Sequence, residues 1–429
     1  MFGFANFLLL ALFAAAVFDL IFALAKGGGL RGALHGLWNT PHLLFGQQLA
    51  EWRLQLGRIL FAAGLAAYEI SVVFCNSMAR QNWAWVQGVM SPVLEWLAFL
   101  CFGAKILFGT RYTWRELLAG GALYFIARWV YFNSQNIWWI GIVVAVLAAK
   151  DVSLRRPLQV YFASGCAAMA VVLALHFAGI VAPDLTSERM GALRGTYGYG
   201  HPNTFGGLVF GLVLAYALLR AQKVRWVDCL LVFAVGVFLL VGPASRSAAL
   251  CTLALAVGLV FCRLRAGHSV PRWWPGTCAG MVGLTAAVSY LLPLLVIKVG
   301  PWNNDIGPAW LAKLDSLLTC RISLTWMAYR LLDVKIAGQV FNWPTVDNSF
   351  AFALFQFGPV VAALLGILFA AALLGHAKQG RRVEVCCLFA MLAYAYMEVQ
   401  PFHLTTNPTA LLLCGAVFAQ TSARWQKIE

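Results

Sequence analysis

Long, unbroken runs of apolar residues dominate this chain and follow one another with short polar segments between them. Each run has roughly the 20 residues that an α-helix needs to cross the hydrocarbon core of a bilayer. The pattern predicts an all-α, polytopic helical membrane protein with about 12–14 transmembrane helices, about 13 in the preferred assignment. The polar stretch 30–55 leaves the number open, because it has room for an interfacial helix. The predicted spans cover residues 2–25, 56–75, 85–104, 116–134, 136–149, 157–182, 202–219, 226–242, 247–262, 276–297, 349–374, 383–399 and 408–422.

Composition excludes the other main classes of protein. Hydrophobic residues make up 62% of the chain and charged residues 11%, whereas a soluble domain carries about 25% charged residues. Disorder requires low hydrophobicity, and a transmembrane barrel requires segments of about ten residues with alternating polarity. We therefore treat residues 1–429 as a single integral membrane domain.

The net charge of +15 comes mostly from Lys and Arg in the short segments between predicted spans. Threading the spans through a membrane places seven basic clusters on one side, which the positive-inside rule assigns to the cytoplasm. This distribution explains the charge without nucleic acid, which we do not expect as a partner. The clusters are Lys26/Arg31/Arg53, Lys105/Arg111/Arg115, Lys150/Arg155/Arg156, Arg220/Lys223/Arg225, Arg263/Arg265/Arg272, Lys378/Arg381/Arg382 and Arg424/Lys427.

The opposite face of the predicted bundle carries three notable segments, 183–201, 242–246 and 298–348. The third is much longer than the other loops, and long ordered loops are usually functional. Within this large extracytoplasmic loop, residues 311–336 have the pattern of one or two amphipathic helices. Such helices would lie along the outer membrane surface or fold over a cavity.

A glycine-rich stretch, 195–207, lies on this outer face after two arginines. Glycines let backbone approach a ligand closely. Pro202 suits the first turn of a helix, with His201 near its N-cap, and the N-terminus of that helix offers N–H groups to an anion. The alternative is a glycine-rich turn that enters a span, with tyrosines as interfacial anchors. The candidate ligand contacts are Arg189, Arg194, Tyr199, His201 and Asn203.

Two further arginines lie on the outer face. Arg246 sits in a tight turn between two apolar runs, where an unpaired charge costs several kcal/mol unless it finds a partner or water. Phosphate is its natural partner, because a guanidinium binds phosphate through two parallel hydrogen bonds. The alternative is that its side chain snorkels to the lipid headgroups. Arg321 lies within the amphipathic segment of the long loop.

Asp347 and Asn348 end the long loop where the next span begins. A carboxylate there serves either as a helix N-cap or as a general base for a hydroxyl, and the sequence leaves both readings open. Glu398, Gln400 and His403, at the outer end of a later span, either line the same cavity or form an ordinary interfacial turn. The outer segments lack the clustered acidic or histidine residues that divalent metals require, so we expect no metal and no cofactor.

Four short motifs on this face occur in a distinctive order between residues 180 and 370. Together they resemble the Wzy-type polysaccharide polymerases of the O-antigen ligase/polymerase superfamily. The N-terminal third of the chain matches that group only in being helical. The motifs are Arg194 with 198–203 and Gly206, then Ser245-Arg246, then Leu314-Asp315 with Arg321-Ile322, and then 347–350 with Gly358.

The resemblance implies a metal-independent glycosyltransferase of the C-type class in the bacterial cytoplasmic (inner) membrane, with its active site on the extracytoplasmic side. Such enzymes join oligosaccharide repeats of an exopolysaccharide, capsule or O-antigen, carried on undecaprenyl diphosphate. Donor and acceptor would both be lipid-linked oligosaccharides, and a chain-length regulator and a flippase would be further partners. Arg194 and Arg246 would hold the donor diphosphate and stabilise it as leaving group, and Arg321 would share that work. Attack opposite the diphosphate would invert the anomeric configuration.

The general base stays open between Asp347 and His201. Related ligases place a histidine near the end of the large outer loop, whereas this sequence has Asp347 at the roughly corresponding place. That departure favours a polymerase over a lipid A-core ligase.

Two alternatives remain beside the polymerase. The first is a ligase-type transferase that moves glycan to another acceptor, whose identity the sequence does not reveal. The second is a flippase or transporter of lipid-linked sugars, which would need charges along a path through the whole membrane and often has symmetry-related repeats. The notable charges here gather on one face, and no repeat is visible.

Overall fold

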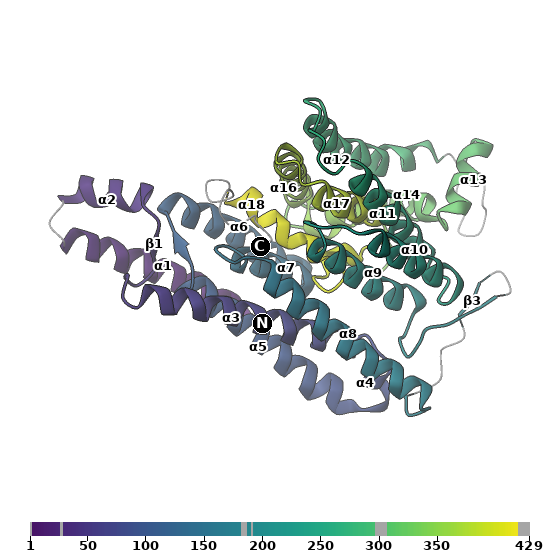
Figure 1. Ribbon diagram of the computed structural model, residues 1–429, viewed down its shortest axis with the longest axis horizontal. Coiled ribbons are helices and arrows are strands. Elements are labelled where there is room, and N and C mark those ends of the chain that lie inside the picture. The colour runs from purple at the N-terminus through teal and green to yellow at the C-terminus, as the bar shows by residue number, and fades with distance from the viewer. Residues whose placement is uncertain (1, 26–28, 182–186, 190–191, 297–306, 419–429) are drawn as a thin grey trace.

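The computed structural model describes residues 2–25, 29–181, 187–189, 192–296 and 307–418, which form an elongated bundle of helices with two short two-stranded sheets (Figure 1). The first half contains α1 (Phe2–Ala25), α2 (Gly29–Asn39), α3 (Ala50–Cys75), α4 (Ala79–Asn82), η1 (Val86–Met90), α5 (Ser91–Phe108), α6 (Trp114–Ser134), α7 (Ile137–Ala148) and α8 (Arg155–Phe177). The second half contains α9 (Pro202–Leu219), α10 (Trp226–Val241), α11 (Arg246–Leu264), α12 (Trp274–Leu291), η2 (Leu292–Leu295), α13 (Ala309–Leu317), α14 (Arg321–Leu331), α15 (Ser349–Phe352), η3 (Ala353–Phe357), α16 (Pro359–Lys378), α17 (Arg382–Met397), η4 (Gln400–Phe402), η5 (Pro408–Leu413) and α18 (Cys414–Val417). Strand β1 (His42–Leu43) pairs antiparallel with β2 (Arg111–Tyr112), and β3 (Ser187–Arg189) pairs antiparallel with β4 (Ala192–Arg194).

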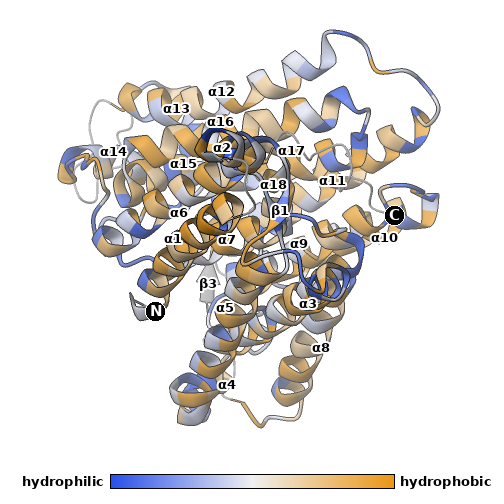
Figure 2. Ribbon diagram, turned by 90° about the vertical axis from the view of Figure 1, so that its left-hand side faces the viewer, coloured by the Kyte–Doolittle hydropathy of each residue, from blue (hydrophilic) through white to orange (hydrophobic). Residues whose placement is uncertain are grey.

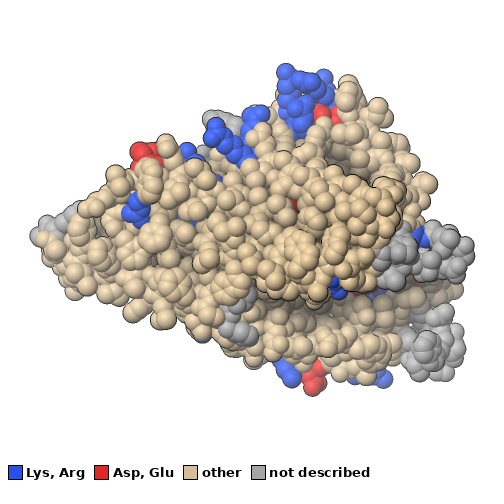
Figure 3. All heavy atoms as spheres, turned by 90° about the horizontal axis from the view of Figure 1, so that it is seen from below, with Lys and Arg blue, Asp and Glu red and all other residues tan. Residues whose placement is uncertain are grey.

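The structure confirms an all-α, polytopic membrane protein. Within the described residues, 8 helices are long and apolar enough to cross a membrane. Figure 2 shows that the helices are mostly apolar, and in Figure 3 the charged side chains lie mainly along two edges of the face, with a broad uncharged area between them. Other predicted spans are also helical but shorter or more charged, so the number of about 13 spans stays a prediction.

Helix bounds agree closely with the hydrophobic pattern in the middle of the chain. The predicted span 202–219 is α9, and the span 226–242 is α10, which ends one residue earlier. The ambiguous stretch 30–55 does contain an extra helix, α2, of which only Ala33 and Leu37 are buried. This arrangement fits an interfacial helix rather than a span.

One predicted span was wrong in being a continuous helix. The span 349–374 is interrupted at Gly358, which has a φ of 88° and precedes Pro359 at the start of α16. A residue before proline is disfavoured in the α conformation, and proline has no N–H for the preceding turn, so the helix restarts there. The final span, 408–422, consists as far as residue 418 of the 3₁₀ helix η5 and the short α18.

The long segment 298–348 contains two helices, α13 and α14, as its amphipathic pattern predicted. Residues 298–306 lie outside the described part of the chain, and the placement of the segment outside the membrane stays a prediction. Buried Asp315, in α13, joins the two helices. Its Oδ1 accepts hydrogen bonds from the backbone N–H groups of Ile322 at 2.7 Å and Ser323 at 3.2 Å. This bond set caps α14 and fixes the position of Arg321 at its start.

The segment that follows α17 packs directly against α9. A Cβ atom added at Gly211 of α9 would collide with the backbone oxygen of Thr405 and would lie 2.9 Å from the Cα atom of Thr406. Backbone atoms cannot move aside as the end of a side chain can, so only glycine fits this contact between α9 and the segment after α17.

We expect Gly211→Ala to destabilise the fold by about 1–3 kcal/mol, the usual cost of overpacking a tight contact, because its Cβ would collide with the backbone oxygen of Thr405. Gly121→Ala in α6 is the matched control, because a Cβ at Gly121 would meet open space. The control also corrects for the intrinsic preference of a helix for alanine over glycine. Thermal unfolding of the purified protein in detergent measures both, and equal unfolding temperatures would contradict the close contact.

Candidate functional site

The polar residues of the predicted outer face gather where six segments of the chain meet. These segments are the end of β4, the starts of α9, α11 and α14, the residues just before α15, and the residue that follows α17. We call this cluster the polar site. Its members are Arg194, His201, Asn203, Ser245, Arg246, Ser247, Arg321, Asp347 and Glu398.

Glu398 is the hub of the polar site. It follows α17 directly, in extended backbone, and its side chain is buried. Its Oε1 atom accepts hydrogen bonds from Nη2 of Arg321 at 2.6 Å, Oγ of Ser247 at 2.9 Å and Nδ2 of Asn203 at 3.1 Å. One carboxylate oxygen thus ties together α17, α14, α11 and α9.

Arg321 is buried, and its guanidinium is held by protein groups. Besides Glu398, its Nη2 contacts Oγ of Ser247 at 3.3 Å, and its Nη1 donates to the backbone oxygen of Leu318 at 2.8 Å. Its Nε donates to the backbone oxygen of Met397. That Arg321 helps to hold a diphosphate stays a prediction. Its contacts favour a role in positioning Glu398 and α14.

Arg194 reaches the same network through Asn203. Its Nη2 donates to Oδ1 of Asn203 at 3.0 Å and to the backbone oxygen of Ala244 at 3.2 Å. Oγ of Ser245 lies 3.5 Å from the same Asn203 oxygen. Asn203, in the first turn of α9, therefore links Arg194 to Glu398. The structure brings together these residues as the sequence predicted.

Arg246 differs from the other two arginines of the polar site. It is the first residue of α11, between Ser245 and Ser247, and its side chain is exposed. Among the described residues it has no hydrogen-bond or ion-pair partner. Its guanidinium is therefore available to a ligand anion beside a fixed polar network.

His201 is the N-cap of α9, as its position before Pro202 predicted. Its Nδ1 accepts a hydrogen bond from the backbone N–H of Asn203 at 3.1 Å. In the neutral imidazole the proton then lies on Nε2, because the accepting nitrogen is deprotonated. Removing a proton from a substrate with Nδ1 would require His201 to give up this cap.

The cap reading of Asp347 is wrong, because Asn348 is the cap of α15. The Asn348 Oδ1 accepts from the N–H groups of Phe350 at 2.9 Å and Ala351 at 3.1 Å. Its Nδ2 donates to Oγ of Ser289 and to the backbone oxygen of Tyr396, both at 3.1 Å. Asn348 is thus a structural residue, and the carboxylate of Asp347 is not needed to cap α15.

Asp347 is half-buried and makes no hydrogen bond to any described residue. Burial raises its pKa above the ordinary value, and the nearby charges of Arg321 and His201 lower it in part. Burial also raises the pKa of Glu398 to about 7, against the lowering effect of Arg321. The polar site thus holds two carboxyl groups with raised pKa values, only one of which is committed to an ion pair.

Two other predicted residues, Tyr199 and His403, stand apart from this network. The Tyr199 side chain is fully buried against Phe205, with 5.6 Å between ring centroids, and burial raises its pKa. The ring of His403 lies against that of Trp138, tilted by 38° with 3.7 Å between ring centroids, and burial lowers its pKa to about 3. Both therefore act as packing residues. Arg189 is in β3, but its side chain lies outside what the structure describes.

The sequence does not predict the central roles of Glu398 and Ser247. In the sequence, Glu398 is one of several polar residues at the end of a predicted span, and Ser247 is part of the turn around Arg246. An acidic residue at the end of an apolar run, on the same face as three arginines, was the available signal. In the described part of the chain, no group of His, Cys, Asp and Glu is arranged to hold a metal ion, and metal independence stays a prediction.

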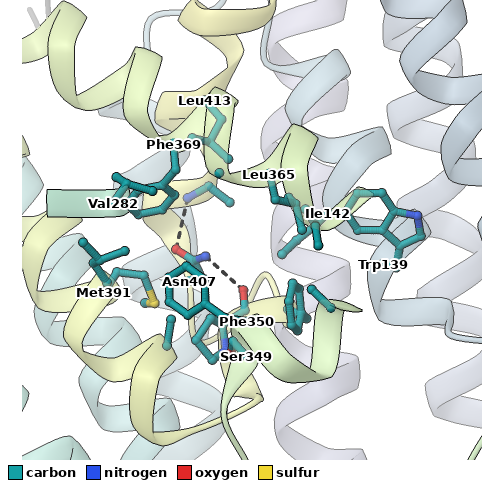
Figure 4. Close-up of a pocket in the computed structure, with 18 of the residues that line it drawn as sticks. Trp139, Ile142, Val282, Ser349, Phe350, Leu365, Phe369, Met391, Asn407 and Leu413 are labelled. Carbon is teal, nitrogen blue, oxygen red and sulfur yellow. Dashed lines mark hydrogen bonds between the residues drawn. The ribbon is translucent and has the colours of Figure 1, made fainter. Parts of the chain in front are cut away.

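An apolar cavity adjoins the polar site (Figure 4). It has a volume of about 90 Å³, and its lining includes Val282, Ser349 and Phe369. Oγ of Ser349 donates to the backbone oxygen of Glu398 at 2.5 Å, so this wall of the cavity is also bonded to the polar hub. A groove between α12 and α16, with a volume of about 530 Å³, shares Val282 and other residues with the cavity.

We expect Glu398→Leu to destabilise the protein by about 3–5 kcal/mol, because it leaves the Arg321 guanidinium buried and unable to lose its charge. The double variant Glu398→Leu with Arg321→Met should recover much of that loss, since no buried charge remains. Arg321→Met alone should cost less than Glu398→Leu, because Glu398, with a pKa of about 7, can take up a proton. Thermal unfolding in detergent compares the three variants. A double variant less stable than Glu398→Leu would contradict the ion pair.

Comparison with known proteins assigns no family to this chain. No family model matches it, and neither the curated proteins nor the solved structures contain a significant match. The function is therefore inferred from the residues of the polar site and the cavity beside them.

Proposed function

We propose that this protein is a glycosyltransferase that joins oligosaccharide repeats carried on a polyprenyl diphosphate, as the resemblance to Wzy-type polymerases implies. One observation carries the proposal. Arg246 is exposed and has no partner among the described residues, and it belongs to the same polar site as Asp347, whose carboxyl makes no hydrogen bond to any of them. A cation for a leaving diphosphate and a base for an attacking hydroxyl are the two groups that a metal-independent glycosyl transfer requires.

Arg246 is the residue best suited to the donor diphosphate. Its guanidinium is exposed, and the serines on either side of it are bonded into the fixed network. Charge develops on the diphosphate as the glycosidic bond breaks, and a guanidinium held at that point stabilises the leaving group. Arg194 supports this site from the network, and Arg321 positions Glu398 and α14 around it.

Asp347 is better suited than His201 to act as the base. The accepting nitrogen of His201 is occupied in the N-cap of α9. Asp347 has no such commitment, and burial raises its pKa toward the working pH, where a general base is most effective. In the proposed reaction Asp347 takes the proton of the acceptor hydroxyl, that oxygen attacks the anomeric carbon, and the electrons of the broken bond leave with the diphosphate.

The apolar cavity supports a substrate with a lipid tail. Cavity and polar site meet at Ser349 and Glu398, so an amphipathic molecule can place its charged group and its hydrocarbon in neighbouring environments. The groove between α12 and α16 offers a lateral way in from the bilayer. Undecaprenyl diphosphate bearing an oligosaccharide has this combination of chemistry.

Two alternatives are weighed against the same geometry. A ligase-type transferase would use the same donor residues, and no residue of the polar site identifies the acceptor. A flippase would require a charged path between the two membrane faces. The middle turns of α9, α11 and α17 carry no charged residue, which favours a transferase. The chain-length regulator, the flippase partner, the bacterial inner membrane and the extracytoplasmic side stay predictions.

We expect Arg246→Ala to abolish polymer formation while the protein still folds, because the exposed guanidinium supports no protein contact. Arg246→Lys should also be poor, since an ammonium cannot form the two parallel hydrogen bonds of a guanidinium. Arg272→Ala, another exposed arginine, is the control and should be neutral. Polymer length in a deletion strain at matched expression is the measurement. Full-length polymer from Arg246→Ala would exclude the diphosphate role.

We expect Asp347→Asn to lower turnover by roughly 10²-fold or more, the scale of a general-base contribution. Donor binding and thermal stability should change little, because Asn348 rather than Asp347 caps α15. The wild-type rate should fall as pH drops through the raised pKa of Asp347, and the residual rate of the variant should lose that dependence. His201→Ala is compared in the same assay. Near-normal rates from Asp347→Asn together with loss in His201→Ala would move the base to His201.

A further inference from the structure

A second cavity lies at the other end of the helices that carry the polar site. It has a volume of about 450 Å³ and is bounded by the α9–α10 turn, the end of α11 and the start of α17. Helices α9, α11 and α17 each have the polar site at one end and this cavity at the other. We call it the basic pocket.

Four cations and one carboxylate line the basic pocket, which gives it a net charge of +3 when all are ionised. They are Lys223, Arg263, Arg381, Arg382 and Glu384. The cations come from three separate parts of the chain, namely the α9–α10 turn, the last turn of α11 and the start of α17, so no single basic run accounts for their convergence. The positive-inside rule explains why basic residues occur at this end but not why they surround a cavity.

Three of these cations are available to a ligand. Lys223 and Arg263 are exposed and Arg381 is half-buried, and none has a hydrogen-bond or ion-pair partner for its side chain among the described residues. Arg382 has a different role. Its Nη2 donates to the backbone oxygens of His268 at 2.5 Å and Ser269 at 3.4 Å, which holds the α11–α12 loop at the pocket.

The position of the basic pocket points to a lipid headgroup. Helix α11 has 19 residues, or about 28 Å at 1.5 Å per residue, close to the thickness of the hydrocarbon core of a bilayer. The pocket therefore lies about one membrane thickness from Arg246, at the opposite interface. Large apolar side chains beside it are exposed, among them Phe261 and Leu264 of α11 and Trp226 of α10. These are surfaces for acyl chains.

Buried Glu384 narrows the chemistry of the ligand further. A carboxylate in the pocket disfavours a dianion such as free phosphate, and it can accept a hydrogen bond from a hydroxyl. A phosphodiester carries a single negative charge, and a glycerol headgroup carries hydroxyls. The pocket thus suits a glycerol phosphodiester better than a phosphate monoester.

We propose that the basic pocket binds the headgroup of an anionic phospholipid, a phosphodiester that bears a glycerol hydroxyl. Lys223, Arg263 and Arg381 contact the phosphate, and Glu384 accepts from the hydroxyl. Basic pockets between transmembrane helices on the cytoplasmic side bind such headgroups in general. The proposal does not rest on the glycosyltransferase function.

The test uses purified full-length protein in detergent and measures binding of short-chain phosphatidylglycerol, phosphatidylcholine and inorganic phosphate by native mass spectrometry. The pocket variant is Lys223→Gln with Arg263→Gln. Its control, Arg155→Gln with Arg156→Gln, removes the same charge from exposed positions outside the pocket. We expect the pocket variant to bind phosphatidylglycerol about 10- to 30-fold more weakly, as expected for the loss of two cations near a lipid phosphate, and the control to change less than about twofold.

Three results would overturn the proposal. They are equal weakening in both variants, equal affinity of the wild type for phosphatidylcholine, and inorganic phosphate that displaces the lipid at similar concentration, which would assign the pocket to a soluble anion. A single Lys223→Gln variant guards against misfolding, because this side chain is exposed and has no partner in the part of the chain that the structure describes. It should weaken binding about fivefold with an unchanged unfolding temperature, and unchanged binding would contradict the proposal.

Discussion

The buried ion pair between Arg321 and Glu398 is the interaction on which the polar site depends. Neither charge can stay in an apolar bundle unless the other charge and further hydrogen bonds offset the loss of water. Ser247 and Asn203 supply those bonds, at 2.9 Å and 3.1 Å from the same carboxylate oxygen. Four helices are thereby held at one point, and the loop helix α14 is attached to the spanning helices.

Some charged residues of the polar site are bonded to protein groups, whereas others remain able to bind a ligand. Arg321 and Glu398 are occupied by each other, and Arg194 is bonded to Asn203. Arg246 is an exposed cation beside them. A rigid network that positions a few available groups is the arrangement that catalysis by electrostatic stabilisation requires, because the surrounding groups need not reorganise during the reaction. The neighbouring apolar cavity offers a similarly fixed environment for the hydrocarbon of a lipid-linked substrate.

The two ends of the bundle have different charge patterns for different physical reasons. At the polar site, the buried Arg321 and Glu398 neutralise each other and Asn203 adds a hydrogen bond, so this part of the network is stable without a ligand. At the basic pocket, cations outnumber the one carboxylate, and most of them have no protein partner among the described residues. An excess of positive charge at a membrane interface is stabilised most readily by anionic headgroups. Helix α11, with Arg246 at one end and Arg263 near the other, joins the two environments.

The sequence by itself determined the all-α class and many of the helices, because a long apolar run in lipid can satisfy its backbone hydrogen bonds only as a helix. It also pointed to Arg246 and Arg321 as candidate site residues, since arginines on the predicted outer face depart from the positive-inside rule. Only the tertiary structure decided that Arg321 is bonded to Glu398, 77 positions away, and that Asn348 is the cap of α15. Local periodicity gives the face on which a residue lies, whereas partners so far apart in sequence are chosen by how the helices pack.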